Sequence, residues 1–298
     1  MGLLVENVFK TFGEKLVVNN ISFEMKEPGV FGLLGTNGAG KTTTIRMILN
    51  IVKKDSGAIK WNGKPTAGQV TNFGYLPEER GLYPKVKVIE QLMYFARLRG
   101  ISHEKAKKDI AYWLERLEAS QYTNMLAEKL SKGNQQKIQF IASIIHDPEL
   151  IFMDEPFSGL DPVNTELFKG VIYELIDKKK YIIMSSHQMS TVEEFCKDIL
   201  ILKNGNAVLS GKLKDIKHSY GRSNLLINSE GNIVELATQE GITSISQNAT
   251  GYEFKISNEE QAYKLLEKIL SKKLRLDKFE IREPSLHEIF IEKVGEAK

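Results

Sequence analysis

The sequence predicts an α/β domain, with helices on both faces of a mostly parallel sheet, followed by a small α+β domain. Residues 30–34 and 150–153 are continuous apolar runs, a pattern typical of parallel strands that are buried on both faces. Helical patterns follow both strands, and this alternation of strand and helix favours a three-layer architecture. After about residue 211 the chain becomes more polar and lacks glycine-rich loops, which indicates a second domain.

The first domain is expected to begin with short antiparallel strands, because apolar and polar side chains alternate in the first thirty residues, with a turn at residues 12–14. The later elements are assigned from apolar spacing and turn residues. They are helices at 42–49, 88–124, 135–145, 163–178 and 191–196, and strands at 58–61, 72–76, 150–154, 181–184, 199–203 and 207–209.

The second domain is expected to have the order βαββαβ, which is the ferredoxin-like pattern. A last helix is predicted at 285–292, after Pro284. The six elements before it are strands at 224–227, 243–247, 252–256 and 274–281 and helices at 233–238 and 259–270.

A glycine-rich turn at residues 35–42 matches G-x-x-x-x-G-K-[ST], the phosphate-binding loop. Glycine allows successive N–H groups to turn inward around a phosphate, and the helix that follows adds its positive N-terminal end. Lys41 can then reach the β- and γ-phosphates, and the Thr42 hydroxyl can hold Mg²⁺. A glycine-rich turn before a lysine also arises by chance, but the strand before it and the helix after it favour nucleotide binding. The predicted contacts are Gly35, Thr36, Asn37, Gly38, Ala39, Gly40, Lys41, Thr42 and Thr43.

Two acids, Asp154 and Glu155, follow the apolar strand at residues 150–153. They are expected at the sheet edge where α/β proteins bind ligands. An Asp after such a strand holds Mg²⁺ in phosphate-loop NTPases, and the neighbouring acid can orient or deprotonate the attacking water. Acids at strand ends are common, so this interpretation depends on the phosphate loop.

Composition excludes several other classes of protein. The net charge of +3 is too small to indicate nucleic-acid binding, and a single cysteine permits no internal disulfide and no cysteine-rich zinc site. No segment approaches 18 consecutive apolar residues, so contact with a membrane is expected to come through a partner. The first seven residues favour a strand and not a signal peptide or a lipidation site.

Three further segments resemble motifs of the ATP-binding subunit of ABC transporters. Residues 130–137 resemble the signature motif, residues 158–161 resemble the D-loop, and Ser186 with His187 resembles the switch-histidine region. Together with the phosphate loop and the two acids they follow the family's order across about residues 1–215. The resemblance implies a RecA-like core with an antiparallel β subdomain and an α-helical subdomain at about residues 85–145.

The resemblance also implies roles for single residues. Glu155 would be the general base, and His187 would contact the γ-phosphate, although a lone histidine after a strand is more often structural. Phe12 would stack on adenine, the alternative being a plain hydrophobic turn residue. Ser131, Gly133 and Asp161 are assigned to the ATP site, with Ser131 and Gly133 touching the γ-phosphate that is bound to the opposite subunit. Two copies, or this chain and a homologue, would therefore enclose two ATP molecules with Mg²⁺.

Two positions depart from the family pattern. Lys132 replaces the first glycine usual in the signature motif, where it could still present its backbone N–H. Glu78 fills the position usually given to a glutamine; a carboxylate cannot donate a hydrogen bond, but it can ligate Mg²⁺. Glu78 is expected to sense the γ-phosphate and to relay its presence to the helical region.

The C-terminal residues 284–290 resemble a subgroup that serves ABC-2-type exporters with the membrane-spanning permease on a separate chain. This resemblance implies an ATPase that drives export from the cytoplasmic face of the cell membrane. The expected domains are residues 1–212 and 213–298. A soluble ABC ATPase without a transport role and a non-hydrolysing module are the alternatives. The cargo, and the choice between homodimer and heterodimer, stay open.

Overall fold

The computed structural model describes residues 2–66, 72–79, 81–242, 245–248 and 251–295. The chain divides into two compact units, residues 1–210 and 211–298. Each unit has a hydrophobic core of its own.

A six-stranded sheet forms the centre of the first unit, with strand order β10-β9-β3-β8-β7-β6. Its strands are β3 (Gly29–Gly35), β6 (Phe73–Leu76), β7 (Leu150–Asp154), β8 (Tyr181–Ser186), β9 (Cys196–Lys203) and β10 (Asn206–Lys212). Neighbouring strands from β9 through β6 run parallel, and every residue of β3 and β7 is buried. The apolar runs at 30–34 and 150–153 are therefore central parallel strands, as predicted.

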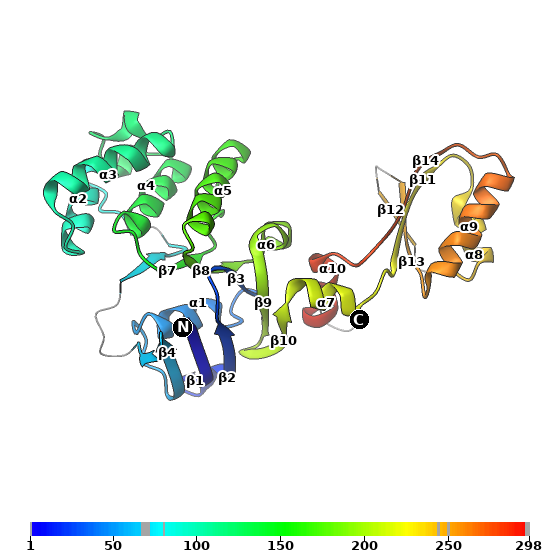
Figure 1. Ribbon diagram of the computed structural model, residues 1–298, viewed down its shortest axis with the longest axis horizontal. Coiled ribbons are helices and arrows are strands. Elements are labelled where there is room, and N and C mark those ends of the chain that lie inside the picture. The colour runs from blue at the N-terminus through cyan, green and yellow to red at the C-terminus, as the bar shows by residue number, and fades with distance from the viewer. Residues whose placement is uncertain (1, 67–71, 80, 243–244, 249–250, 296–298) are drawn as a thin grey trace. The chain divides into compact units, whose positions relative to one another are not determined.

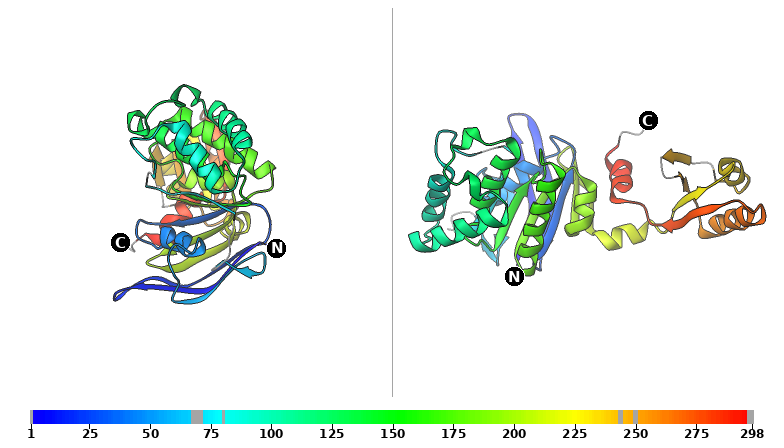
Figure 2. Two further views of the ribbon diagram at one scale, coloured as in Figure 1. Left: turned by 90° about the vertical axis from the view of Figure 1, so that its left-hand side faces the viewer. Right: turned by 90° about the horizontal axis from the view of Figure 1, so that it is seen from above.

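A second sheet in this unit has the order β2-β1-β4-β5 and is antiparallel. It contains β1 (Leu3–Phe12), β2 (Lys15–Met25), β4 (Ser56–Trp61) and β5 (Lys64–Pro65). Its apolar side chains share one core with α1 (Lys41–Ile48) and with the parallel strands. Figure 1 shows α1 between the two sheets, and Figure 2 (left) shows the same layering from the side.

The remaining helices of the first unit are α2 (Val88–Leu98), α3 (His103–Arg116), α4 (Lys132–Ile144), α5 (Pro162–Asp177) and α6 (Met189–Phe195), and α2 to α5 lie on the opposite face of the six-stranded sheet from α1 (Figure 1). The prediction of one helical stretch at 88–124 is wrong in detail. Gly100, with φ of 80°, ends the first helix, and α3 ends before two short 3₁₀ turns at Ser120–Tyr122 and Ala127–Lys129. In the described part of the chain, none of the helices combines the length and the apolar character needed to span a bilayer.

The second unit has a four-stranded antiparallel sheet in the order β12-β13-β11-β14. Its elements are α7 (Leu213–Ser219), β11 (Asn224–Ser229), α8 (Ile233–Gln239), β12 (Ile245–Asn248), β13 (Gly251–Lys255), α9 (Glu259–Ser271), β14 (Leu276–Arg282) and α10 (Leu286–Val294). From β11 to β14 the order is βαββαβ, which confirms the ferredoxin-like prediction. Residues 243 and 244 of the predicted strand 243–247 lie outside the described residues.

Candidate active site

The phosphate loop joins β3 to α1 and takes backbone angles that favour glycine. Gly35, Gly38 and Gly40 have φ of 154°, 78° and 105°. A Cβ added to Gly40 would stand 2.8 Å from the carbonyl oxygen of Val17, and one added to Gly35 would stand 2.6 Å from that of Leu202. Gly35 and Gly40 therefore satisfy both a dihedral requirement and a requirement for space.

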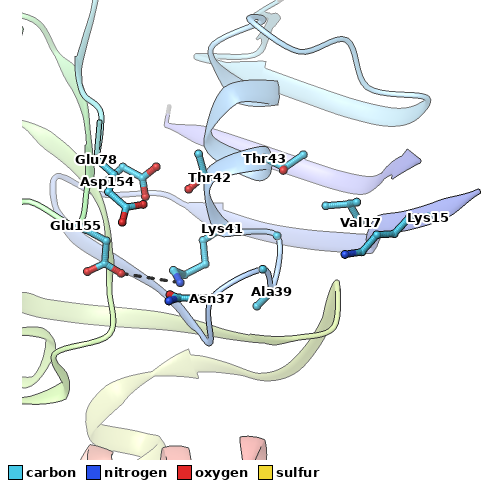
Figure 3. A pocket seen from close by; sticks show the side chains of 12 residues that line it. Lys15, Val17, Asn37, Ala39, Lys41, Thr42, Thr43, Glu78, Asp154 and Glu155 are labelled. Carbon is cyan, nitrogen blue, oxygen red and sulfur yellow. Dashed lines mark ion pairs between the residues drawn. The ribbon is translucent and has the colours of Figure 1, made fainter. Parts of the chain in front are cut away.

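The loop lines a cavity of about 300 Å³ (Figure 3). The lining residues are Lys15, Val17, Asn37, Gly38, Ala39, Gly40, Lys41, Thr42, Thr43, Glu78, Asp154 and Glu155. Nine of these twelve were predicted from sequence to contact nucleotide or metal, and a tenth, Glu155, was predicted to be the general base. The two others come from β2, in a stretch where the sequence pattern indicates only a strand.

Lys41 lies at the base of the cavity and is 6% exposed. Its ammonium group donates hydrogen bonds to the carbonyl oxygens of Gly35 (2.8 Å) and Thr36 (3.2 Å). It also stands 3.9 Å from the Glu155 carboxylate (Figure 3). The charge of Lys41 is thus held between the loop and the end of β7, where it can stabilise an anion in the cavity.

Asp154 ends β7 and is 1% exposed. Ser185 of β8 donates a hydrogen bond to Oδ1 of Asp154, whereas Oδ2 is buried without a hydrogen-bond partner. Figure 3 shows the side chains of Asp154 and Glu78 on one side of the cavity, with the Thr42 side chain facing them from α1. The sequence does not predict a role for Ser185, because the residues around a serine in a strand do not indicate a hydrogen bond to a neighbouring strand.

The oxygen atoms of this group fit Mg²⁺. The described residues contain no cluster of three or more His, Cys, Asp or Glu side chains arranged to hold a metal ion alone. Mg²⁺ is usually bound by one or two carboxylates together with substrate phosphates, and does not need such a cluster. The buried, unpartnered Oδ2 of Asp154 is an oxygen ligand of the required kind.

Glu155 follows β7 in a left-handed conformation, with φ of 51°. Its N–H donates to the Ser185 carbonyl oxygen (3.1 Å), which holds this uncommon conformation in place. Its Oε2 stands 2.8 Å from Nδ1 of His187 and accepts a hydrogen bond from the His187 N–H (3.3 Å). The structure therefore brings Glu155 and His187 together, with the carboxylate buried and the imidazole half exposed.

The signature-like residues form a second group. Ser131 is the N-cap of α4 and accepts a hydrogen bond from the N–H of Asn134 (3.3 Å), so α4 begins at Lys132 and not at the predicted residue 135. Asp161 caps α5 and accepts from the N–H of Asn164 (2.9 Å), and this bond lowers the pKa of Asp161. A Cβ on Gly133 would meet Asn164 at 3.5 Å, so the two helix ends are adjacent.

Ser131, Gly133, Asp161 and Phe12 do not line the cavity around Lys41. Phe12 ends β1, is 49% exposed, and has the Lys10 ammonium 5.0 Å from its ring centre. Its stacking on adenine stays a prediction. Lys132 is exposed in the first turn of α4.

Comparison with known proteins gives a family match for each unit. Residues 18–158 match the model of the ABC transporter family, and residues 211–294 match the C-terminal domain of DrrA1-3-like ATP-binding proteins. Among solved structures, an ATP binding subunit of an ABC transporter is 29% identical with a TM-score of 0.70, covering 74% of this chain and 94% of that chain.

Relatives of similar length carry related names. The uncharacterized ABC transporter ATP-binding protein YhaQ of Bacillus subtilis is 48% identical over 294 residues, 98% of each chain. The linearmycin resistance ATP-binding protein LnrL of the same organism is 32% identical over 98% of each chain. The Nod factor export ATP-binding protein I of Burkholderia orbicola is 32% identical over 69% of each chain.

Proposed function

Since the chain belongs to the family of ABC transporter ATP-binding proteins, and is an ATPase of that family with a DrrA-like C-terminal domain, we propose that it powers a membrane exporter. The permease would be a separate chain of the ABC-2 type, and the ATPase would work at the cytoplasmic face of the membrane. The observation that carries this proposal is the likeness over 98% of the chain to LnrL, which is named for resistance to linearmycin. The Nod factor relative, which is named for export, supports the same direction of transport.

Binding of the ATP phosphates is assigned to the loop and to Lys41. The loop N–H groups and the N-terminal end of α1 attract the phosphates, and the buried Lys41 ammonium neutralises their charge. Thr42, Asp154 and Glu78 would hold Mg²⁺, which adds further charge neutralisation when it is bound.

Hydrolysis is assigned to Glu155 and His187. The Glu155 carboxylate would take a proton from the attacking water, since one of its oxygens has no hydrogen-bond partner. His187 holds the other oxygen at 2.8 Å, so the carboxylate is oriented before the reaction. The exposed side of the imidazole would contact the γ-phosphate.

The second group of residues is assigned to the ATP bound by the opposite subunit. The N–H groups of the first helical turn lack partners within the helix, so the start of α4 can donate to an anion. Ser131 and Gly133 would contact that γ-phosphate, with Asp161 beside them. ATP would then stabilise the closed pair because it contacts both chains only in that state.

Contact with the permease is assigned to a hollow of about 320 Å³ between β6, α2 and α4. Tyr75, Leu82, Phe95 and Leu98 give it an apolar lining, and Arg99 and His146 add polar groups. Leu98 is 66% exposed on the adjacent surface of α2. An apolar segment of the permease could bury this surface and receive the movement of the helical region.

The test is purification of a tagged Glu155→Gln chain from detergent-solubilised host membranes with ATP and Mg²⁺, followed by mass spectrometry. This variant is expected to bind ATP but to hydrolyse it slowly, so that the closed assembly accumulates. A tagged Lys41→Ala chain, which loses its main phosphate contact, is the matched control.

Recovery of a multi-spanning membrane protein, enriched with Glu155→Gln over Lys41→Ala, is the expected result. Recovery of soluble partners alone, with the chain absent from membranes, would contradict export and favour a soluble ABC ATPase.

A further inference from the structure

One buried side chain holds the segment that carries Glu78. Gln139 lies on α4 and is 5% exposed. Its Nε2 donates hydrogen bonds to the carbonyl oxygens of Pro77 (3.2 Å) and Glu79 (3.1 Å), and its Oε1 accepts one from the N–H of Gly81 (3.2 Å). Backbone groups of three residues around Glu78, namely Pro77, Glu79 and Gly81, are therefore bonded to a single carboxamide.

The chemistry of these three bonds selects a carboxamide. Two carbonyl oxygens need donors and one N–H needs an acceptor, and a glutamine side chain supplies two donors and an acceptor from one planar group. An ionised carboxylate would accept from Gly81 but could not donate to the two carbonyls. A hydrocarbon side chain would leave all three groups without this partner.

Gln139 links two different parts of the proposed ATP site, the segment that carries Glu78 and the helix α4. Glu78 lines the cavity, where its side chain faces Asp154 and Thr42 (Figure 3). Gln139 lies eight residues after Ser131, which is about 12 Å along the same helix. The helix α4 thus connects the Glu78 segment to Ser131 at its N-terminal end.

A buried glutamine often does no more than satisfy nearby backbone groups, and the chain contains such a case for comparison. Gln91 of α2 is 1% exposed, donates to the carbonyl oxygen of Val86 (3.1 Å) and accepts from the N–H of Tyr83 (3.2 Å). The segment that Gln91 holds does not line the ATP cavity. Gln139 differs because its segment carries a side chain that enters the cavity.

We propose that Gln139 is a positioning residue for ATP hydrolysis. It sets the place of Glu78 in the cavity and fastens the Glu78 segment to α4, so that a displacement of Glu78 by ATP is passed to the helix that begins after Ser131. The inference rests on the proposed function because that function assigns Glu78 and Ser131 to ATP contacts.

The test is a double-mutant cycle on the full-length chain, with kcat and KM for ATP measured at saturating Mg²⁺. Gln139→Met is expected to lower kcat about tenfold, because a small misplacement of a catalytic group is costly. KM is expected to change by less than about twofold, since the phosphate loop is untouched. In a Glu78→Ala background the same change is expected to alter kcat by less than about twofold, because the residue acts through Glu78.

Two further variants separate positioning from general stability. Gln91→Met removes the same kind of buried carboxamide and is expected to keep kcat within about twofold of wild type. Gln139→Glu conserves volume but cannot donate when ionised, so its kcat is expected to fall as in Gln139→Met. If Gln139→Met does not fold, as judged by thermal unfolding, Gln139→Glu decides the question.

Hydrogen exchange supplies a readout that does not depend on activity. The Gly81 amide is expected to exchange faster in Gln139→Met than in wild type, and to be unchanged in Gln91→Met. Wild-type kcat in Gln139→Met, or the same loss of kcat with and without Glu78, would overturn the proposal. Failure to recover a membrane partner would contradict the proposed export function, but the double-mutant cycle would still test the role of Gln139.

Discussion

At the scale of single residues, the two acids after β7 are distinguished by their partners. Asp154 is held by Ser185 through one oxygen and keeps the other, buried one without a partner. Glu155 is held by His187 and stands near Lys41. This difference in partners supports the proposed roles, in which Asp154 binds Mg²⁺ and Glu155 accepts a proton, although the two residues are neighbours in sequence.

Replacement of Glu155 by glutamine tests this division. Glu155→Gln is expected to lower kcat for ATP on the order of 10² to 10⁴-fold, the range for loss of a general base. ATP affinity should stay near wild type, because the amide conserves the shape of the side chain. Phosphate release and calorimetric ATP binding measure the two quantities. Glu166→Gln, on the exposed face of α5, is the control; loss of ATP binding in Glu155→Gln would contradict the assignment.

Replacement of Gly40 by alanine tests the geometry of the phosphate loop. Gly40→Ala would combine a left-handed φ with a 2.8 Å approach to the Val17 carbonyl oxygen, so the loop must move and ATP affinity should fall at least about tenfold. Gly63 has φ of 79° but open space around it, and lies outside the cavity. Gly63→Ala should cost about 1 kcal/mol of stability and leave ATP affinity unchanged. Equal ATP affinities of the two variants, measured by titration, would show that the close approach is unimportant.

At the scale of elements, patterns that lie within one segment could be predicted, whereas contacts between segments could not. The apolar spacing of α5 and the start of the last helix after Pro284 are local patterns, and so is the glycine pattern of the loop. The short helix α7 was missed because only Leu213 and Ile216 anchor it. Lys15 and Val17 reach the site from β2, Ser185 from β8, and Gln139 reaches the supporting segment from α4. The sequence around each of them shows nothing but an ordinary strand or helix.

The C-terminal motif at residues 284–290 has a structural role at the start of α10. Ser285 and Glu288 form a capping box at the start of α10. Glu288 also accepts hydrogen bonds from Lys255 (2.6 Å) and from Asn224 (2.7 Å), which is fully buried on β11. Burial alone would raise the pKa of Glu288, but the bonds from Lys255, Ser285 and Asn224 lower it to about 2. The motif therefore fastens α10 to the sheet of its own unit.

Glu288→Ala is expected to lower the free energy of local unfolding of α10 by about 2 kcal/mol, because charge-assisted hydrogen bonds and a cap are lost together. Amides of α10 should then exchange with solvent at least about tenfold faster at pH 7.

Because the folded-state pKa of Glu288 lies below the ordinary 4.5, the stabilisation is complete above about pH 4.5 and is lost as the pH falls toward 2. The ratio of variant to wild-type exchange should therefore shrink in acid. Glu260→Ala, which removes an exposed pair with Lys264 on α9, should leave the ratio near one; a similar ratio for both variants would contradict the role of Glu288.

At the scale of the whole molecule, the proposed catalytic residues fall into two groups within one chain. Lys41, Asp154 and Glu155 surround the cavity, whereas Ser131, Gly133 and Asp161 gather at the ends of α4 and α5 and do not line it. Under the proposed function, a complete site takes its second group from another chain, and a C₂ pair of identical chains would supply two such sites at once. This arrangement makes a prediction that no arrangement within one chain would share.

Two inactive chains are expected to restore activity when they are mixed. Lys41→Ala disables the phosphate loop of its own chain, and Ser131→Glu places a negative charge against the phosphate held by its partner. A mixed pair contains one site with both defects and one site with neither. If pairing is random and the sites act independently, an equal mixture should recover about a quarter of wild-type ATPase activity. A mixture of Lys41→Ala with Glu155→Gln is the control, because those residues belong to the same cavity and each site of that pair keeps a defect. Equal activity of the two mixtures, measured by phosphate release, would mean that Ser131 does not serve the site of another chain.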